Sequence, residues 1–252
     1  MARLLTYNVH RCVGVDRQLD IARIVGVIAE LDPDIVCLQE LDVGRARTGG
    51  VDQAHAIAER LDMSFQFHPA MRVEKELYGD AILTRLPETL VRADALPTLS
   101  GLKGLEPRGA LWSLIQVGGV EINVFNTHLG LIPREQRLQA AALMGQEWIG
   151  SPRLEGPVIL TGDFNATSIT RPYQIFTKTL DDAQRRLGLK PSLKTFPSGF
   201  PAIRIDHCFV SEAIRITGAR TGASPLARMA SDHLPLVIDF EVSAAAAAPS
   251  QI

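Results

Sequence analysis

The sequence predicts an α/β protein of one domain, built from β-sheets flanked by helices. Strand-like and helix-like hydrophobic periods alternate through the first half of the chain, and no linker, repeat or break in composition separates Arg3 from Val242. We therefore expect residues 1–242 to form a single domain. In the tail that follows, five alanines precede a proline, too few for a stable helix, so residues 243–252 are expected to be disordered.

In the first half, the hydrophobic period separates strands from helices. RLLTYN (3–8) reads as a strand, and the apolar residues that follow recur every 3.6 positions up to Leu31, where Pro33 stops a helix. The apolar run 34–40 has the length and β-branched content of a buried strand, and it ends at Glu40. After it we expect a polar loop over 41–50, a short helix over Gln53–Leu61, a β-like stretch over Phe65–His68 and a strand in YGDAILTR.

The second half begins with a long loop over 98–108 and a β-hairpin. Two β-rich runs flank Gly118 and Gly119, which can supply the positive φ angles of a tight turn. Pro133 suits the first turn of a helix. The predicted buried face of that helix carries Leu138, Ala141, Ala142, Gly145 and Trp148. PVILTGDFNA, RIDHCFVS and LPLVIDFEV supply the remaining strands.

The composition is that of an ordinary globular protein, with 46% hydrophobic and 21% charged residues. No apolar run approaches the length that spans a membrane, and a strand that begins at Arg3 leaves no room upstream for a signal peptide, so we expect a cytoplasmic protein. The net charge of −2 removes the broad attraction that most non-specific DNA binders need. Cys12, Cys37 and Cys208 form no CxxC pair and are expected to be buried free thiols.

Six predicted strand ends carry polar groups that suit a hard metal ion and a phosphate. They are Asn8, Glu40, His128, Asp163 with Asn165, Asp206, and Asp232 with His233. Each is weak evidence alone, because an Asp or Asn at a strand end is usually a turn or capping residue. Six ends with one compatible chemistry indicate a shared site. Carboxylate and amide oxygens without a Cys₂His₂-type cluster favour Mg²⁺, or Mn²⁺, over structural Zn²⁺.

TYNVH, LQE, NTHL, GDFNA, RIDHCFVS and SDHLP, in this order, resemble the motif set of the endonuclease/exonuclease/phosphatase (DNase I-like) superfamily. The resemblance runs from Asn8 to His233, and Asn-Val-His at 8–10 is similar to its small bacterial members rather than to its abasic-site repair enzymes. The Trp-Cys-Asp-Arg signature of the inositol 5-phosphatases is absent. The resemblance implies a four-layer α/β sandwich, in which two packed mixed β-sheets are flanked by helices.

The resemblance also implies roles at the metal and at the attacking water. Asn8, Glu40 and Asp232 match metal-binding positions, with Glu40 the principal anionic ligand. Asp163 matches the aspartate that orients or deprotonates the water. In the terminal Asp-His pair, the carboxylate of Asp232 would orient and charge the imidazole of His233. Whether Asp163 or His233 is the general base is left open, because protonation depends on distances.

At the phosphate, the resemblance implies that Asn165 and His128 each hold an oxygen. Asp206 matches an acid that lies near His128 or assists protonation of the leaving group. Arg108, directly before a strand, could bind the phosphate bidentately, although an ordinary strand-flanking arginine is an equal alternative.

Other residues near the motifs are candidates for substrate binding. Tyr78 lies in a segment that lines the site in many relatives, and Asp80 replaces the asparagine common there, as an extra ligand or as a solvated turn acid. His10 could contact a phosphate or pack beside the site. Basic residues in the loops could attract an anionic head group or be solvated surface charges: Arg45, Arg47, Arg72, Lys75 and Lys103.

These expectations combine into a Mg²⁺-dependent phosphoesterase that hydrolyses a phosphodiester by metal-assisted, in-line attack of water. A small diester or a lipid head group is favoured slightly over nucleic acid, because the chain lacks net positive charge and an added nucleic-acid module. A repair-type DNA or RNA nuclease is the alternative, and an inactive scaffold is a remote one. We expect a monomer, with peripheral contact to anionic lipid left open.

Overall fold

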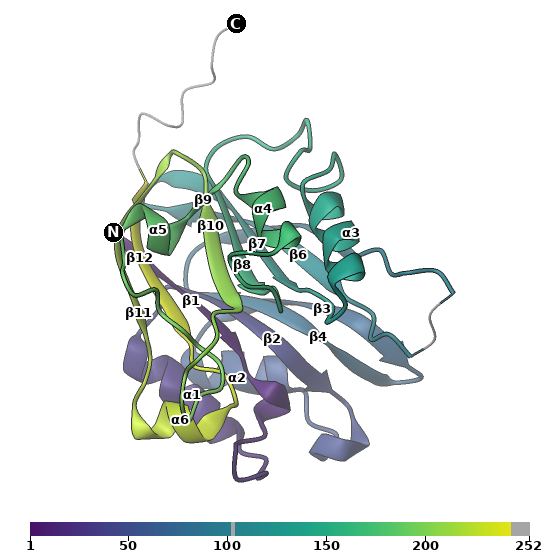
Figure 1. The fold of residues 1–252 in the computed structure, drawn as a ribbon. Coiled ribbons are helices and arrows are strands. Elements are labelled where there is room, and N and C mark those ends of the chain that lie inside the picture. Colours follow the sequence, from purple (N-terminus) through teal and green to yellow (C-terminus); the bar gives the residue numbers. More distant parts are fainter. Residues whose placement is uncertain (102–103, 243–252) are drawn as a thin grey trace, which may run out of the picture.

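Two mixed β-sheets form the centre of the computed structural model, which describes residues 1–101 and 104–242 (Figure 1). The first sheet has the order β11 (Ile214–Thr221), β12 (Leu236–Val242), β1 (Ala2–Asn8), β2 (Ile35–Val43), β4 (Glu76–Thr84), β3 (Ser64–Val73). The second has the order β5 (Glu88–Ala95), β6 (Gly109–Val117), β7 (Val120–His128), β8 (Val158–Asp163), β10 (Asp206–Val210), β9 (Asp181–Asp182). β1 pairs in parallel with β2, and β7 with β8.

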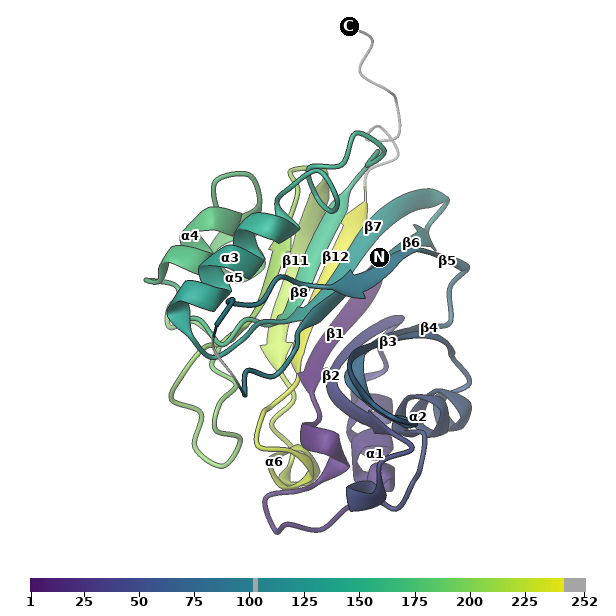
Figure 2. The ribbon, with the colours of Figure 1, turned by 90° about the vertical axis from the view of Figure 1, so that its right-hand side faces the viewer.

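Helices cover the outer face of each sheet, so the predicted four-layer sandwich is confirmed (Figure 2). The first sheet carries α1 (Ile21–Leu31), α2 (Gln53–Leu61) and α6 (Pro225–Ala230). The second carries α3 (Pro133–Leu143) and α4 (Arg171–Phe176), and the short α5 (Ala183–Arg186) follows β9. Buried apolar side chains fill the space between the sheets, because both inner faces of the strands are apolar there.

A buried polar contact joins the two sheets between β7 and the strands β2 and β4. Asn126 of β7 donates its amide hydrogens to the carbonyl oxygens of Leu38 in β2 (2.9 Å) and Ala81 in β4 (2.8 Å). Its Oδ1 accepts from Gln39 Nε2 at 2.8 Å. Since all these groups are removed from water, each depends on its partner, and the network fixes how β7 lies against β2.

Most predicted elements are confirmed. α1 ends before Pro33, and Asp20 caps its first turn, because the Asp20 carboxylate accepts from the backbone amides of Ala22 and Arg23. α2 spans the predicted range. Gly118 (φ 58°) and Gly119 (φ 84°) form the hairpin turn. The three cysteines are buried and free. β5 and β11 were not predicted, because much of each strand is half-exposed at or near a sheet edge and lacks a continuous apolar run.

Two predictions at the level of elements are wrong. The polar loop expected over 41–50 begins late, because β2 continues past an irregularity between Leu38 and Leu41 to Val43. The buried face of α3 is also different: Leu138 is 40% exposed, and the helix ends at Leu143, before Gly145 and Trp148. The residues that it buries are Glu135, Gln136, Gln139, Ala140 and Leu143. Buried glutamines broke the apolar pattern, since their amides find backbone partners.

No helix in residues 1–101 and 104–242 is long and apolar enough to cross a membrane. The predictions made for Lys103 and for the tail, residues 243–252, lie outside the described residues.

Candidate active site

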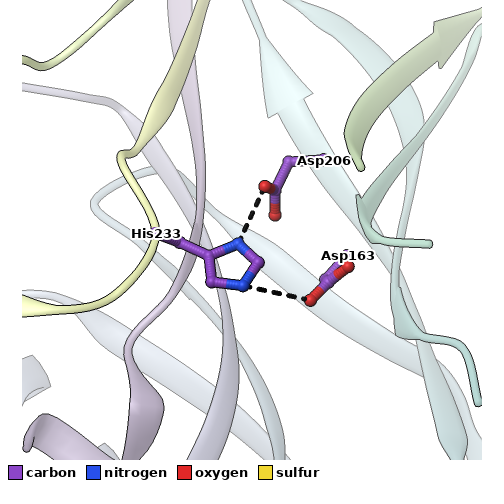
Figure 3. Close-up of side chains that lie close together, drawn as sticks. All are labelled: Asp163, Asp206 and His233. Carbon is purple, nitrogen blue, oxygen red and sulfur yellow. Dashed lines mark hydrogen bonds and ion pairs between the residues drawn. The ribbon is translucent and has the colours of Figure 1, made fainter. Parts of the chain in front are cut away.

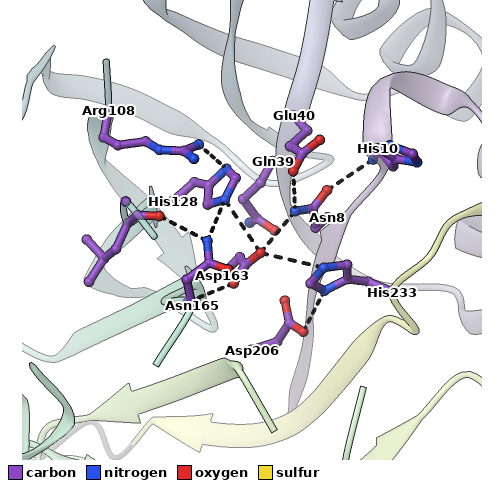
Figure 4. Close-up of polar contacts among 12 residues, drawn as sticks. Asn8, His10, Gln39, Glu40, Arg108, His128, Asp163, Asn165, Asp206 and His233 are labelled. Atoms are coloured by element: carbon purple, nitrogen blue, oxygen red, sulfur yellow. Dashed lines mark hydrogen bonds and ion pairs between the residues drawn. The ribbon is translucent and has the colours of Figure 1, made fainter. Parts of the chain in front are cut away.

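The polar residues predicted at strand ends converge at one edge of the sandwich (Figure 4). The parallel registers place Asn8 beside Gln39, and His128 beside Asp163. β10 runs antiparallel to β8 and begins at Asp206, opposite Asp163. A cavity of about 470 Å³ opens here. Ten of the predicted residues line it: His10, Glu40, Arg47, Tyr78, Arg108, His128, Asp163, Asn165, Asp232 and His233. Asn8 and Asp206 do not line the cavity, but Asn8 hydrogen-bonds Asp163 and Asp206 hydrogen-bonds His233.

Glu40 reaches the cavity because its backbone leaves the regular strand geometry. Its φ is 62°, which is uncommon for a residue with a Cβ, and it stands in the irregularity of β2. Asn8 lies between Glu40 and Asp163, and donates its amide hydrogens to Oε1 of the first and Oδ2 of the second, each at 3.0 Å. Asn8 Oδ1 accepts the backbone amide of His10. The amide of Asn8 therefore fixes the spacing of the two carboxylates.

His233 lies between two buried carboxylates (Figure 3). Its Nδ1 is 2.9 Å from Asp206 Oδ2, and its Nε2 is 3.7 Å from Asp163 Oδ2. Burial by itself lowers the pKa of His233, but Asp206 and Asp163 raise it to about 10. Burial and the nearby Asp206 raise the pKa of Asp163 above its ordinary value, although His233 and Asn8 lower it. His233 is therefore an imidazolium at neutral pH, beside a carboxylate whose affinity for a proton is raised.

This arrangement corrects the acid that was implied to orient His233, and for Asp206 it leaves the second of the two alternatives, assistance with protonation of the leaving group. Asp206, not Asp232, orients His233, and it does not lie against His128. The side chain of Asp232 is 39% exposed, and its Oδ1 is 3.9 Å from His10 Nδ1. Neighbouring residues in an extended segment point in opposite directions, which explains why an adjacent Asp-His pair need not be in contact.

Arg108, His128 and Asn165 form a second cluster of polar side chains at the cavity. Arg108 is 6% exposed, and its Nη1 is 2.8 Å from His128 Nδ1. Asn165 Nδ2 is 3.0 Å from both His128 Nε2 and the carbonyl oxygen of Leu129, which fixes the orientation of the amide. Burial, Arg108 and His233 lower the pKa of His128 well below its usual value, so the ring is neutral.

A neutral imidazole has one lone pair, but both ring nitrogens of His128 face N–H donors. In either tautomer, one N–H group of Arg108 or Asn165 has no acceptor on the ring. Arg108 Nε is also buried without a hydrogen-bond partner among the described residues. Unmatched buried donors are costly, and an oxygen atom of an anion would satisfy them. The prediction that Arg108 is a phosphate ligand rather than an ordinary strand-flanking arginine gains support from this geometry.

Tyr78 and Asp80 lie on β4 beside Glu40. Tyr78 lines the cavity, and the Arg47 guanidinium lies 5.4 Å from the centre of its ring. Asp80 is 3% exposed, and its carboxylate lies 3.4 Å from the backbone nitrogen of Glu40. Burial raises the pKa of Asp80 to about 8, although Arg108 lowers it. The alternative of a solvated turn acid is therefore wrong for Asp80.

The turn after β1 has an unusual backbone. His10, Arg11 and Cys12 all have positive φ, between 46° and 57°, a conformation that costs residues with a Cβ energy. His10 Nδ1 is 3.2 Å from the Val13 carbonyl oxygen, and its Nε2 is 2.6 Å from Arg11 Nη2. The carbonyl fixes the hydrogen on Nδ1, so Nε2 accepts from Arg11. Both nitrogens of His10 are thus used within the protein, which favours packing over phosphate binding.

Sequence reasoning missed several residues at the cavity. Arg11 lines it, and Glu106 ion-pairs with Arg108 at 2.7 Å. Thr195 donates a hydrogen bond to Asp206, and Ser231 donates to the Asn8 carbonyl oxygen. The acid two residues before Arg108 and the arginine directly after Asn-Val-His were visible patterns, whereas the hydroxyl groups carry no such pattern. Of the basic residues predicted on the rim, Arg47 lines the cavity, but Arg45, Arg72 and Lys75 do not.

Two sets of side chains at the site offer oxygen donors to a divalent cation: the buried acid-histidine cluster, and the carboxylates of Glu40 and Asp232. Asp163, Asp206 and His233 offer ligand atoms within 4.8 Å of one another. His233, however, directs both nitrogens to carboxylates and carries a proton, and an imidazolium cannot ligate a metal ion. The carboxylates of Glu40 and Asp232 both line the cavity outside that cluster, and hard oxygen donors suit Mg²⁺.

Comparisons with known proteins identify a family model and several similar chains. A model of the Endonuclease/Exonuclease/phosphatase family matches residues 5–233. The Escherichia coli (strain K12) protein YbhP, described as uncharacterized, is 29% identical over 256 residues, which cover 95% of this chain and 96% of that protein. The Bacteroides thetaiotaomicron VPI-5482 mannosyl-6-phosphatase Bt3783 superimposes with a TM-score of 0.74 at 21% identity, over 96% of this chain and 100% of that one. The human Nocturnin catalytic domain with a bound sulfate anion superimposes with a TM-score of 0.72 at 23% identity, over 96% of this chain and 94% of that one.

Proposed function

Because the chain belongs to the endonuclease/exonuclease/phosphatase family, we propose that it is a Mg²⁺-dependent phosphoesterase that hydrolyses a small phosphodiester. The observation that carries the proposal is that two groups of side chains line one cavity. In the first, Arg108 Nε has no hydrogen-bond partner among the described residues, and the His128 ring can accept from only one of Arg108 and Asn165. In the second, the Asp163 carboxylate, whose pKa is raised, lies beside the His233 imidazolium. An anion and a water molecule are the reactants that these two groups would bind.

In this proposal, different side chains have separate roles in an in-line attack. Arg108 and Asn165 would bind the non-bridging oxygens and stabilise the charge that develops on them. Asp163 would orient the water and accept its proton, because His233 already carries one near neutral pH. His233, held by Asp206, would stabilise charge or donate its proton to the leaving oxygen. Mg²⁺, when bound by Glu40 and Asp232 with Asn8 beside them, would neutralise charge on the phosphate and the leaving group.

The cavity volume favours a small diester over an extended polymer. About 470 Å³ lies within the usual range of small-molecule pockets, and the net charge of −2 gives no general attraction to nucleic acid. A nuclease is the second candidate, because the family to which the chain belongs is named for endonucleases and exonucleases as well as phosphatases. A phosphomonoesterase is the third, since Bt3783 is named a mannosyl-6-phosphatase.

Turnover of three substrates by the purified protein tests the proposal. We expect release of p-nitrophenol from bis(p-nitrophenyl) phosphate, loss of that activity in EDTA, and recovery with Mg²⁺ or Mn²⁺. Faster cleavage of p-nitrophenyl phosphate would instead identify a monoesterase, and salt-sensitive nicking of supercoiled plasmid at low enzyme concentration would identify a nuclease. Diester cleavage that persists in EDTA would contradict the metal requirement.

A further inference from the structure

Two further arginines, Arg11 and Arg47, line the cavity. Arg11 stands in the turn after β1, and Arg47 stands in the short 3₁₀ helix Ala46–Thr48 after β2. Neither is needed to bind the scissile phosphate, because Arg108, Asn165 and His128 form a separate cluster.

Arg47 is held rigidly. Its Nε and Nη2 donate to the two carboxylate oxygens of Asp42, each at 2.7 Å, and Asp42 is fully buried. Its guanidinium lies 5.4 Å from the centre of the Tyr78 ring. Nη1 makes no hydrogen bond within the described residues, so one edge of a fixed guanidinium stays available. Such a pre-organised fork loses little freedom when it binds an anion.

The same buried residues also position Arg11. Gln53 is fully buried. Its side chain accepts a hydrogen bond from the backbone N–H of Asp42 at 2.9 Å and donates one to the carbonyl oxygen of Arg11 at 2.7 Å. The Arg11 side chain donates only to the His10 ring, and no carboxylate lies within 4.0 Å of it among the described residues. The buried residues Asp42 and Gln53 therefore link Arg11 and Arg47, which lie in separate loops at one cavity. The charge of Arg11 is not offset by a direct partner.

We infer that Arg11 and Arg47 form a second anion subsite, which binds an anionic group that the substrate carries in addition to its scissile phosphate. The inference rests on the proposed function and names the substrate class: a diester with a further phosphate or carboxylate. Four acids line the cavity: Glu40, Glu106, Asp163 and Asp232. Glu40 and Asp232 are the groups proposed to bind Mg²⁺, so the metal would offset their charge, and Glu106 is paired with Arg108. Guanidinium groups bind such anions through two parallel hydrogen bonds.

Three p-nitrophenyl diesters that differ in the charge of the second substituent test the subsite. Thymidine 5′-(p-nitrophenyl phosphate) carries no further charge, its 3′-phosphate derivative carries an anion, and p-nitrophenylphosphorylcholine carries a cation. We expect kcat/KM to be highest for the anionic ester, about tenfold above the uncharged one and more above the cationic one, since only the anionic ester accepts charge-assisted hydrogen bonds from the two arginines.

Arg11→Gln leaves no buried acid unpaired, and we expect it to reduce the preference for the anionic ester to about threefold or less. Arg47→Gln combined with Asp42→Asn, which removes the buried carboxylate together with its partner, should do the same. Arg72→Gln is the matched control, because Arg72 is exposed and does not line the cavity. A preference that survives both altered proteins, or no preference in the wild type, would overturn the subsite while leaving the proposed function intact. Failure to cleave any of the three esters would contradict both.

Discussion

Asp163 is the residue on which the other groups of the site converge. Its Oδ2 accepts from Asn8 at 3.0 Å and lies 3.5 Å from His128 Nε2 and 3.7 Å from His233 Nε2. Its Oδ1 accepts the backbone amide of Asn165 at 2.9 Å. A single carboxylate therefore joins the side that would hold the metal to the side that would hold the phosphate.

We predict that Asp163→Asn reduces kcat by about 1,000-fold or more, because an amide cannot accept the proton of water, and general bases contribute up to about four orders of magnitude. The fold should persist, since asparagine fills the same volume. Steady-state rates and circular dichroism at matched protein concentration check both statements. A rate within tenfold of the wild type would remove Asp163 from the role of base.

Arg108 tests whether geometry or charge binds the phosphate. Lysine keeps the charge but cannot donate to His128 while a second, fixed N–H faces the substrate. We predict that Arg108→Lys lowers kcat/KM roughly 10- to 100-fold, the effect of losing a hydrogen bond to a charged group. Arg72→Lys provides a control at an exposed position outside the cavity. Equal kinetics for the two altered proteins would mean that Arg108 supplies only charge.

The sequence predicted these residues better than it predicted their contacts. Hydrophobic runs that end in Asn8, Glu40, His128 and Asp163 indicate strand ends, and parallel strands bring such ends together. The partner of His233 could not be predicted in the same way, because it depends on the antiparallel register of β10 against β8. The positive φ of Glu40 also follows from tertiary packing, which residue type alone does not report.

At the scale of an element, α3 supports two loops of the site through its buried amides. Gln136 Nε2 donates to the carbonyl oxygens of Gly130 and Asn165, each at 2.8 Å, and Gln139 Oε1 accepts the Gly130 amide at 2.9 Å. The loop after β7 and the loop after β8 are thereby tied together. Apolar periodicity predicted the presence of this helix but placed its buried face wrongly, since hydrogen-bonded glutamines look solvent-exposed in a sequence.

We predict that Gln136→Ala lowers kcat about tenfold with a smaller change in KM. The reason is that the Asn165 carbonyl loses its buried donor, at a cost of about 1–3 kcal/mol, and the Asn165 amide is no longer held toward the phosphate. Leu138→Ala on the same helix is the matched control, because Leu138 is 40% exposed. If both substitutions change only the melting temperature, α3 has a structural role alone.

At the scale of the whole molecule, strands from distant parts of the chain share each sheet. β1 lies between β12 and β2, so both ends of the described chain belong to one sheet, and Asn126 joins that sheet to the other. We therefore propose that residues 1–242 form one domain. The composition predicted this arrangement only indirectly, through the absence of a linker. Thermal unfolding followed by near-UV and far-UV circular dichroism should give one coincident transition, and two separated transitions would contradict a single domain.

A second buried charge network, away from the catalytic cavity, should govern the stability of the second sheet in acid. Asp182 accepts from Arg204 Nη2 at 2.6 and 2.8 Å and from the Tyr173 hydroxyl at 2.8 Å, and it caps α5. Burial raises the pKa of Asp182, but the His207 ring and Arg204 outweigh it, so the pKa lies well below its ordinary value. A lowered pKa in the folded state stabilises the protein above the unfolded-state pKa, and this contribution is lost as the pH falls below it.

We predict that Asp182→Asn lowers the melting temperature at pH 7 by about 10 °C, because removing one partner of a buried ion pair costs about 3–5 kcal/mol and each kcal/mol shifts a chain of this size by about 2–4 °C. Asparagine can still cap α5, so the substitution isolates the charge. Below about pH 4, the ordinary pKa of an aspartate, the difference between the two proteins should shrink, since the unfolded wild-type chain then binds a proton at Asp182 that the folded protein does not, which favours unfolding. Melting curves from pH 7 to about pH 3 measure this difference, and a constant offset across that range would mean that Asp182 stabilises the fold by packing rather than by charge.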